Sequence, residues 1–200
     1  MSWEKDLEEL KKRAELAKEM GGIERIAKHY ARGRLTVRER IDQFLDEGSF
    51  HETGEITGKV SYDESGEIKE FIPANFVFGR GKVNGREVVI AGDDFTVRGG
   101  AADARIGNKS LYSLKLAEHL RLPLVNLVDG SGGGGSVKTL ETMGATYVPG
   151  LPSWQNIVRL LSMVPVVGAC MGSVAGLGSA RVVASHFSIM VKGSAQMFVA

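Results

Sequence analysis

The sequence predicts an α/β domain built on a largely parallel sheet. From residue 76 onwards, apolar runs of strand length alternate with stretches of helical length. Strands that alternate with helices are joined by right-handed crossovers, which make neighbouring strands parallel. The runs 122–128 and 165–171 are apolar at most positions, as in strands covered by helices on both faces. Asn84 and Gly85, between two further apolar runs, predict a hairpin.

The N-terminal part predicts helices instead. A highly charged stretch over 3–20 ends at two glycines, which are typical of a helix C-terminus, and a second helix is expected over 23–31. Thr36 and Glu39 have the spacing of a capping box, which predicts a third helix. We expect two regions: an N-terminal helical arm over 1–50 and the main lobe over 51–200.

Beyond the hairpin, the pattern predicts alternating elements in a fixed order. These are a loop over 92–102, a helix over 103–121, a strand over 123–128, a helix over 153–162, a strand over 165–171, a helix over 174–184 and a strand over 187–191.

Composition excludes several classes of function. A chain of 200 residues with 43% hydrophobic content suits one packed domain. Its net charge of +1 indicates no nucleic-acid or anionic-membrane partner. The single cysteine, Cys170, excludes an internal disulfide and favours a reducing, cytoplasmic location. The uncharged stretch 160–180 contains Pro165 and glycines, so we expect a buried strand, loop and helix there, not a membrane span.

A glycine-rich loop over 130–136, Gly-Ser-Gly-Gly-Gly-Gly-Ser, follows the strand 123–128. A flexible linker is one interpretation, but a break here would split a strand–helix unit. A phosphate-binding P-loop is a second, but Lys138 stands two positions too late. The third is an oxyanion hole, in which bare backbone amides stabilise negative charge on a carbonyl oxygen. We favour the third interpretation.

A second glycine-rich turn over 172–178 follows the next strand and supports the oxyanion interpretation. The sequence lacks a nucleophile elbow, and its four histidines have no metal-ligand spacing, so we expect no metal. We expect Cys170 to be a small buried residue. Asp93 and Asp94 suggest acid–base chemistry, but a solvated strand end explains them equally well.

Several further motifs resemble one known family. They are 33–41 (Gly-Arg-Leu-Thr-Val-Arg-Glu-Arg-Ile), 46–50 (Asp-Glu-Gly-Ser-Phe), 79–86, 94–100 and Lys109. With the two glycine turns they resemble the N-terminal half of the β-type carboxyltransferase subunits of biotin-dependent acyl-CoA carboxylases. The likeness runs from about Ile23 to Ala200 and includes the propionyl-CoA and methylcrotonyl-CoA carboxylases and related decarboxylase subunits.

The resemblance implies a crotonase (ClpP)-like fold of stacked ββα units that holds an acyl-CoA thioester. It also implies carboxyl transfer from carboxybiotin to the acyl-CoA through an enolate, with biotin as the proton acceptor. The implied enolate-binding amides are Gly132, Gly133 and, with a shift of one residue, Gly134, together with Ala175 and Gly176. The implied contacts to the coenzyme A nucleotide and pyrophosphate are Arg98, Gly99, Gly100, Ala101 and Lys109.

The sequence departs from the family pattern in both turns. Gly130 is inserted, Gly134 and Gly135 replace the usual Ala-Arg pair, and Leu177 replaces a glycine. No biotin-attachment segment is present, so the resemblance implies biotin on a carboxyl carrier partner, a biotin carboxylase component and a homo-oligomeric core. A hydratase or isomerase of the same fold normally needs an acidic residue near the second turn, and 172–191 contain none. Two further functions stay open, those of a decarboxylase subunit and of a non-catalytic assembly subunit.

The chain stops within the apolar run 196–200, so we expect a lobe truncated at its C-terminal end and only half of an active site. The isolated chain should therefore transfer carboxyl from free carboxybiotin far more slowly than a complete subunit. A radiometric transfer assay checks this, and a normal rate would contradict the half-site hypothesis.

Overall fold

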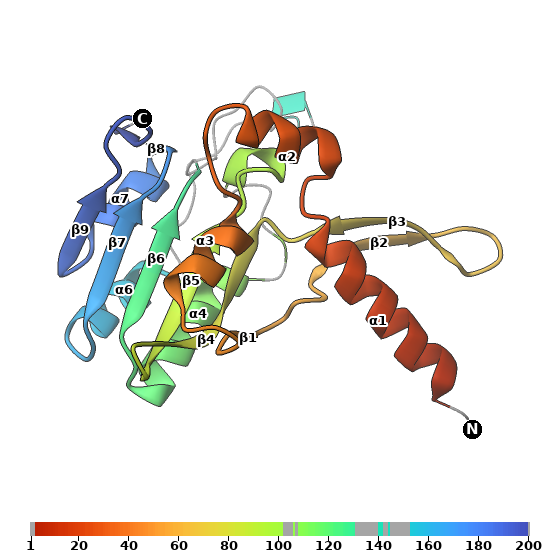
Figure 1. Cartoon of the computed structure of the whole chain (residues 1–200), viewed down its shortest axis with the longest axis horizontal. Helices are drawn as coiled ribbons and strands as arrows, with labels where there is room; N and C mark the ends of the chain where they lie inside the picture. Colours follow the sequence, from red (N-terminus) through yellow and green to blue (C-terminus); the bar gives the residue numbers. More distant parts are fainter. Residues whose placement is uncertain are drawn as a thin grey trace.

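A six-stranded mixed sheet forms the centre of the protein (Figure 1). The computed structural model describes residues 3–101, 106, 108–130, 140–141, 144 and 153–199. Strands β1, β4 and β5 are antiparallel, whereas β5, β6, β7 and β9 are parallel. In sheet order the strands are β1 (His51–Glu52), β4 (Phe76–Val83), β5 (Arg86–Asp93), β6 (Leu124–Val128), β7 (Val166–Cys170) and β9 (Phe187–Met190).

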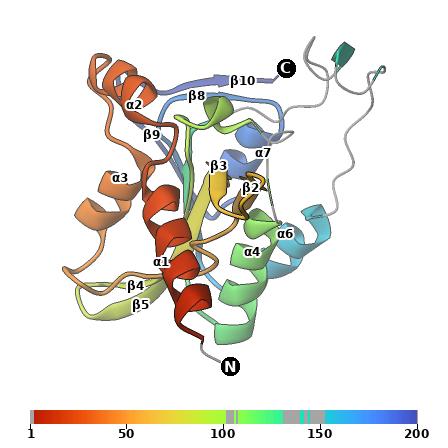
Figure 2. The ribbon, with the colours of Figure 1, turned by 90° about the vertical axis from the view of Figure 1, so that its right-hand side faces the viewer.

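Helices cover both faces of this sheet. Figure 2 shows α3 (Val37–Phe44) on one side, and α4 (Lys109–Leu120) and α6 (Trp154–Leu161) on the other. The short helix α7 (Leu177–Val183) packs on β6 and β7. The side chains of β6 alternate between the two faces, with Leu124 in the core under α4 and α6 and Val125 in the core under α3. This arrangement explains why the strand is apolar at successive positions.

The N-terminal helices pack on different parts of the lobe. Helix α1 (Glu4–Lys18) lies beside the hairpin of β2 (Gly58–Tyr62) and β3 (Ile68–Pro73), where the Tyr62 hydroxyl donates to Glu9 at 2.7 Å. Helix α3 instead belongs to the central core, because Ile41 is fully buried among residues of β4, β5 and β6. The division of the chain at residue 50 into a helical arm and a main lobe stays a prediction.

The predicted elements are largely confirmed. Asn84 and Gly85 have left-handed φ angles of 50° and 78° and join β4 to β5 in the predicted hairpin. Helices α1 and α2 (Ile23–Tyr30) and strands β6, β7 and β9 lie where the sequence places them. Helix α4 begins at Lys109, whereas the sequence predicted a start at residue 103. Most of residues 103–108 lie outside the described residues. Strands β1, β2 and β3 were not predicted.

One predicted helix starts later than expected. Residues 173–175 form strand β8, which pairs in parallel with β10 (Gln196–Phe198), and α7 begins only at Leu177. The expectation of a helix from 174 is wrong, because pairing with β10 keeps this segment extended. The uncharged stretch 160–180 is otherwise divided into β7, a turn and α7, as expected. Within the described residues, no helix combines the length and the apolar character needed to cross a bilayer.

The capping box of α3 is confirmed and generates a stability prediction. The Thr36 hydroxyl accepts from the Glu39 amide at 3.3 Å, and Glu39 accepts from the Thr36 amide at 2.8 Å. Thr36→Ala removes one half of this reciprocal pair, so it should lower the free energy of unfolding by about 1 kcal/mol. Urea denaturation measures the loss, and Thr36→Ser is the control that should retain most of the stability. Equal midpoints for Thr36→Ala and the wild type would contradict a role for the cap.

Candidate active site

Three glycine-containing turns meet at the carboxyl ends of the parallel strands. The segment Asp129–Gly130 follows β6 and lies between the turn after β5 and the turn after β7. A Cβ atom on Gly100 would lie 2.4 Å from the Asp129 carbonyl oxygen, and one on Gly178 would lie 2.5 Å from the Gly130 carbonyl oxygen. Such distances leave no room for a side chain, so the backbones touch directly. Ligands of open α/β sheets bind at this end of the strands.

The second turn also contacts the first through a side chain. A Cβ atom on Gly172 would lie 2.1 Å from Asp129 Oδ1. The start of the first glycine loop, at Asp129 and Gly130, therefore lies beside the second turn, which agrees with the oxyanion interpretation.

A buried ion pair fixes the start of the first glycine loop. Arg40 Nη1 donates to Asp129 Oδ2 at 2.7 Å, and the two side chains are 7% and 0% exposed. Arg40 comes from α3, so this pair ties the far face of the sheet to the end of β6. An ion pair without solvent depends on both partners, because either charge alone would be costly to bury.

A second buried carboxylate is also neutralised. Asp93 Oδ1 accepts from Arg181 Nη1 at 3.0 Å, and Asp93 Oδ2 accepts from the Asp129 amide at 3.2 Å. The neighbouring Asp94 accepts from both the amide and the hydroxyl of Thr96, and burial raises the pKa of its carboxyl group. The expectation that Asp93 and Asp94 form a solvated strand end is wrong, since both are buried against these partners.

The predicted residues of the second turn differ in the direction of their amides. The Gly176 amide donates to the Phe198 carbonyl of β10 at 3.1 Å. Backbone groups alternate in direction along a strand, so the Ala175 amide points away from β10. Gly176 has φ 55° and ψ −120°, a combination that residues with a side chain rarely adopt. The predicted amides of Gly132, Gly133 and Gly134 lie outside the described residues.

Four of the residues assigned to the coenzyme A nucleotide form one short turn. The 3-10 turn η1 spans Arg98–Gly100, and each of its residues has a positive φ angle. Arg98 is exposed, and Ala101 accepts from the Asn75 side chain at 2.9 Å. The turn places Gly100 against Asp129, so the predicted nucleotide segment adjoins the first glycine loop.

Lys109 lies apart from that turn. Its side chain is 5% exposed, and Nζ bonds to Glu52 Oε1 at 3.2 Å, while Arg38 Nη1 bonds to Glu52 Oε2 at 2.7 Å. Burial lowers the pKa of Lys109, and the Glu52 carboxylate counters this effect. A nucleotide contact by Lys109 stays a prediction, and it would require the ammonium group to leave Glu52.

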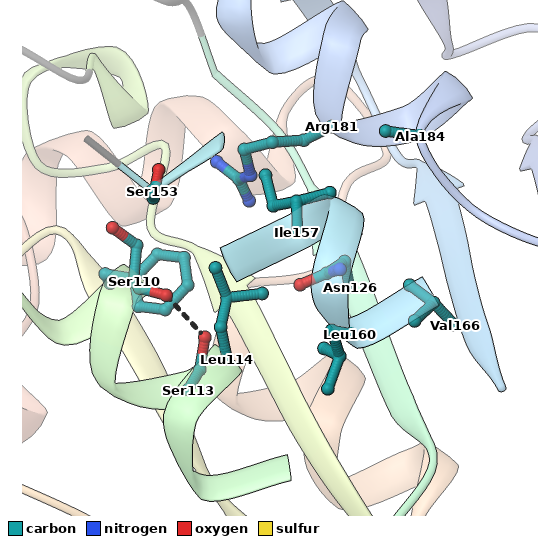
Figure 3. Close-up of a pocket in the computed structure, with 11 residues that line it drawn as sticks. Ser110, Ser113, Leu114, Asn126, Ser153, Ile157, Leu160, Val166, Arg181 and Ala184 are labelled. Carbon is teal, nitrogen blue, oxygen red and sulfur yellow. Dashed lines mark hydrogen bonds between the residues drawn. The ribbon is translucent and has the colours of Figure 1, made fainter. Parts of the chain in front are cut away.

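A small cavity lies beneath the sheet, between α4, α6 and α7. Figure 3 shows Asn126 and Arg181 pointing into it among apolar side chains. Arg181 Nη2 is buried without a hydrogen-bond partner among the described residues, and the cavity has a volume of about 30 Å³. This volume holds one or two water molecules, so the cavity is too small for an acyl-CoA.

The remaining reactive side chains suit structural roles. Cys170 is fully buried, as expected, and burial raises the pKa of its thiol. Its Sγ donates weakly to the Gly172 carbonyl at 3.6 Å. Across the described ranges, no three His, Cys, Asp or Glu side chains are grouped to hold a metal ion.

Sequence reasoning missed the buried arginines. Arg40 shares one face of α3 with the buried residues Val37 and Ile41, and this placement was an available signal. An arginine on the apolar face of an amphipathic helix usually has a buried carboxylate partner. The partner itself, Asp129, is 89 residues away and could not be identified from local patterns.

Comparison with known families identifies the family of this chain. Residues 28–200 match the family model described as the carboxyl transferase domain. The chain belongs to this family. The matched range contains the sheet, both glycine turns and the Arg40–Asp129 pair.

Two curated relatives and one solved structure resemble this carboxyl transferase domain. The propionyl-CoA carboxylase β chain of Roseobacter denitrificans is 32% identical over 196 residues, which cover 96% of the chain and 37% of the relative. The methylmalonyl-CoA decarboxylase subunit alpha of Propionigenium modestum is 31% identical, covering 98% and 37%. Transcarboxylase 12S, solved with methylmalonyl-coenzyme A and methylmalonic acid bound, aligns with a TM-score of 0.74 at 25% identity, covering 100% and 38%.

The solved structure confirms the predicted fold class. The carboxyl transferase domain has the mixed α/β, crotonase-like fold of transcarboxylase 12S. The chain spans less than two-fifths of the length of the proteins that it matches.

The buried position of Lys109 generates a prediction that distinguishes a role in stability from a role in binding coenzyme A. Lys109→Met should lower the free energy of unfolding by about 1–3 kcal/mol, because the buried Glu52 carboxylate loses one of its two cationic partners. The affinity for coenzyme A, measured by isothermal titration calorimetry, should stay within about twofold of the wild type. Lys115→Met, on the exposed face of the same helix, is the matched control. A large loss of affinity with unchanged stability would instead establish Lys109 as a nucleotide contact.

Proposed function

We propose that this chain is the acyl-CoA-binding part of a biotin-dependent carboxyl transferase. It holds an acyl-CoA thioester and stabilises the enolate that forms when a carboxyl group is exchanged at the α- or γ-carbon of the acyl group. The observation that carries the proposal is the meeting of three glycine turns at Asp129–Gly130. Bare backbone at the carboxyl ends of adjacent parallel strands suits the binding of a developing oxyanion.

The proposed oxyanion donors come from both loops. The first set belongs to the glycine loop, at Gly132 and Gly133 or, one residue on, Gly134. In the second turn we favour the Ala175 amide, because the Gly176 amide already donates to Phe198. Gly176 then acts as a positioning residue, since its backbone angles turn the chain from β8 into α7. The coenzyme A nucleotide is proposed to lie along Arg98, Gly99, Gly100 and Ala101.

The charges at this site favour an external proton acceptor. Asp129 and Asp93 are buried carboxylates next to the glycine turns, and each is paired with an arginine, whereas the neighbouring buried Asp94 is bonded to Thr96. A carboxylate held in a buried ion pair is a poor general base, because protonation would leave the arginine unpaired. The described side chains therefore suit a role in binding and positioning.

Biotin on a partner protein would supply both the carboxyl group and the proton acceptor. The described residues fit this division of labour, because they provide backbone amides and neutralised carboxylates rather than a free base. The partners we propose are a biotin carboxyl carrier and a biotin carboxylase component. Transcarboxylase 12S is described as a hexamer assembly, which favours a homo-oligomeric core here as well.

Three competing functions have less support. A hydratase or isomerase would use an acidic side chain close to the thioester, and the segment 172–191 has none. A decarboxylase subunit would carry out the same acyl-CoA half-reaction in the opposite direction, moving the carboxyl group from the acyl-CoA to biotin. A non-catalytic assembly subunit would not need glycine turns packed this closely.

Gly176 provides the test of this function. Gly176→Ala forces a side chain into φ 55°, ψ −120° and should displace the Ala175 amide. We expect carboxyl transfer from methylmalonyl-CoA or malonyl-CoA to free biotin to fall about 100-fold or more below the slow rate expected of the wild-type chain, since loss of one oxyanion donor has effects of this size. Affinity for the acyl-CoA should change less than about threefold.

Gly85→Ala is the matched control, because Gly85 also has a positive φ angle but lies in the distant β4–β5 turn. It should reduce stability by about 1 kcal/mol without a loss of transfer. Equal activity in the two variants would refute the role of the second turn. Joint loss of activity and acyl-CoA binding in Gly176→Ala would indicate collapse of the turn instead.

A further inference from the structure

Arg34 extends from the link between α2 and α3 to the second glycine turn. Its Nη1 atom lies 3.0 Å from the position that a Cβ atom on Gly172 would occupy, and its Nη2 atom donates to the Ser194 carbonyl at 3.4 Å. Its Cζ atom lies 5.9 Å from the centre of the Phe95 ring, which is a cation–π distance. One side chain therefore contacts the segments that follow β5, β7 and β9.

The backbone around Arg34 is held in place on both sides. The Arg34 amide donates to the His29 carbonyl at 3.3 Å, and His29 Nε2 lies 3.1 Å from the Leu35 carbonyl oxygen. The capping box at Thr36 then starts α3. Figure 2 shows α2, β8 and β10 at one end of the molecule, away from the β4–β5 turn. The arginine side chain therefore starts from a fixed point and loses less conformational freedom in reaching the turn.

The Asp129 carboxylate lies on the other side of Gly172. The same Cβ position on Gly172 is 2.1 Å from Asp129 Oδ1, so the guanidinium of Arg34 and this carboxylate are within about 5 Å of each other. Arg40 binds Oδ2, whereas Oδ1 is buried without a hydrogen-bond partner among the described residues. Arg34 forms no closer ion pair in the described part of the chain. Its charge therefore stabilises a carboxylate that one arginine satisfies only in part.

The contact with Ser194 links Arg34 to the proposed oxyanion donor. Two residues after Ser194, the Gln196 amide donates to the Gly172 carbonyl at 2.9 Å. Gln196 begins β10, and β10 pairs with β8 as far as Ala175. Because β8 and β10 are joined residue by residue, a displacement at Ser194 is transmitted along this two-stranded sheet to the Ala175 amide.

We propose that Arg34 is a positioning residue of the carboxyl-transfer site, which holds the second glycine turn through Ser194 and through the Asp129 carboxylate. Arg34 acts without touching the substrate, by keeping the Ala175 amide aimed at the developing oxyanion. A planar guanidinium has donors that reach the Ser194 carbonyl and the side of Gly172 at once, whereas a lysine ammonium reaches one of them. This role rests on the proposed function, because it takes the Ala175 amide as an oxyanion donor.

Steady-state kinetics of carboxyl transfer from methylmalonyl-CoA to free biotin measure the effect of Arg34 on the site. Arg34→Met keeps an apolar stem and removes the charge. We expect kcat to fall about ten- to a hundredfold below the slow rate of the wild-type chain, while KM for methylmalonyl-CoA stays within about twofold, because the displaced amide acts mainly in the transition state. Arg34→Lys should lose only about three- to tenfold. The matched control is Arg86→Met, at an exposed position of the distant β4–β5 turn, and it should retain the wild-type kcat.

Amide hydrogen exchange tests the position of the turn without any catalysis. In Arg34→Met, amides of residues 172–176 and 194–198 should exchange about tenfold faster, whereas those of β4 and β5 should keep their wild-type rates. Unchanged exchange at the turn, equal acceleration across the whole chain, or a kcat equal to that of Arg86→Met would each overturn the proposal. Absence of carboxyl transfer by the wild-type chain would refute the proposed function, and the exchange rates would still decide whether Arg34 holds the turn.

Discussion

Asp129 and Gly130 are held between the turns of two neighbouring strand ends, and the site depends on this constraint. Gly100 and Gly178 approach the carbonyl oxygens of Asp129 and Gly130, and Gly172 approaches the Asp129 carboxylate, each too closely for a side chain. Because the three turns contact one another directly, a shift in one is transmitted to the other two. Loops that are usually mobile are thereby held at fixed positions on a rigid sheet. Such preorganisation allows backbone amides to stabilise charge without first being reoriented.

Buried arginines from opposite sides of the sheet complete this arrangement. Arg40 reaches Asp129 from α3, and Arg181 reaches Asp93 from α7. Each pair neutralises a negative charge that would otherwise lie next to the proposed enolate site, where like charges would repel each other. The capped helix α3 is therefore part of the site's support, although the sequence suggested only an appended arm. The N-terminal region therefore contributes to the central core through α3.

Sequence motifs of neighbouring residues predicted most of the fold. The features that were not predicted depend on partners far away in the chain. The capping box at Thr36 and the turn at Asn84 depend on neighbours within a few residues, and both were predicted correctly. Strand β8 depends on pairing with β10, more than 20 residues later, so its short glycine-flanked sequence gave no strand signal. The same reason applies to the site, because Arg40 and Asp129 are 89 residues apart in the chain.

The thiol of Cys170 lies at the end of β7, shielded by the turn at Gly172 and by the Gln196 carbonyl of β10. Burial keeps this thiol protonated, and a protonated, inaccessible thiol reacts slowly with alkylating reagents. Modification therefore requires the two-stranded sheet of β8 and β10 to move away from the end of β7. The rate at which Cys170 is alkylated therefore reports how often the second glycine turn opens locally. A ligand that rigidifies this turn would lower the alkylation rate without contacting the sulfur atom.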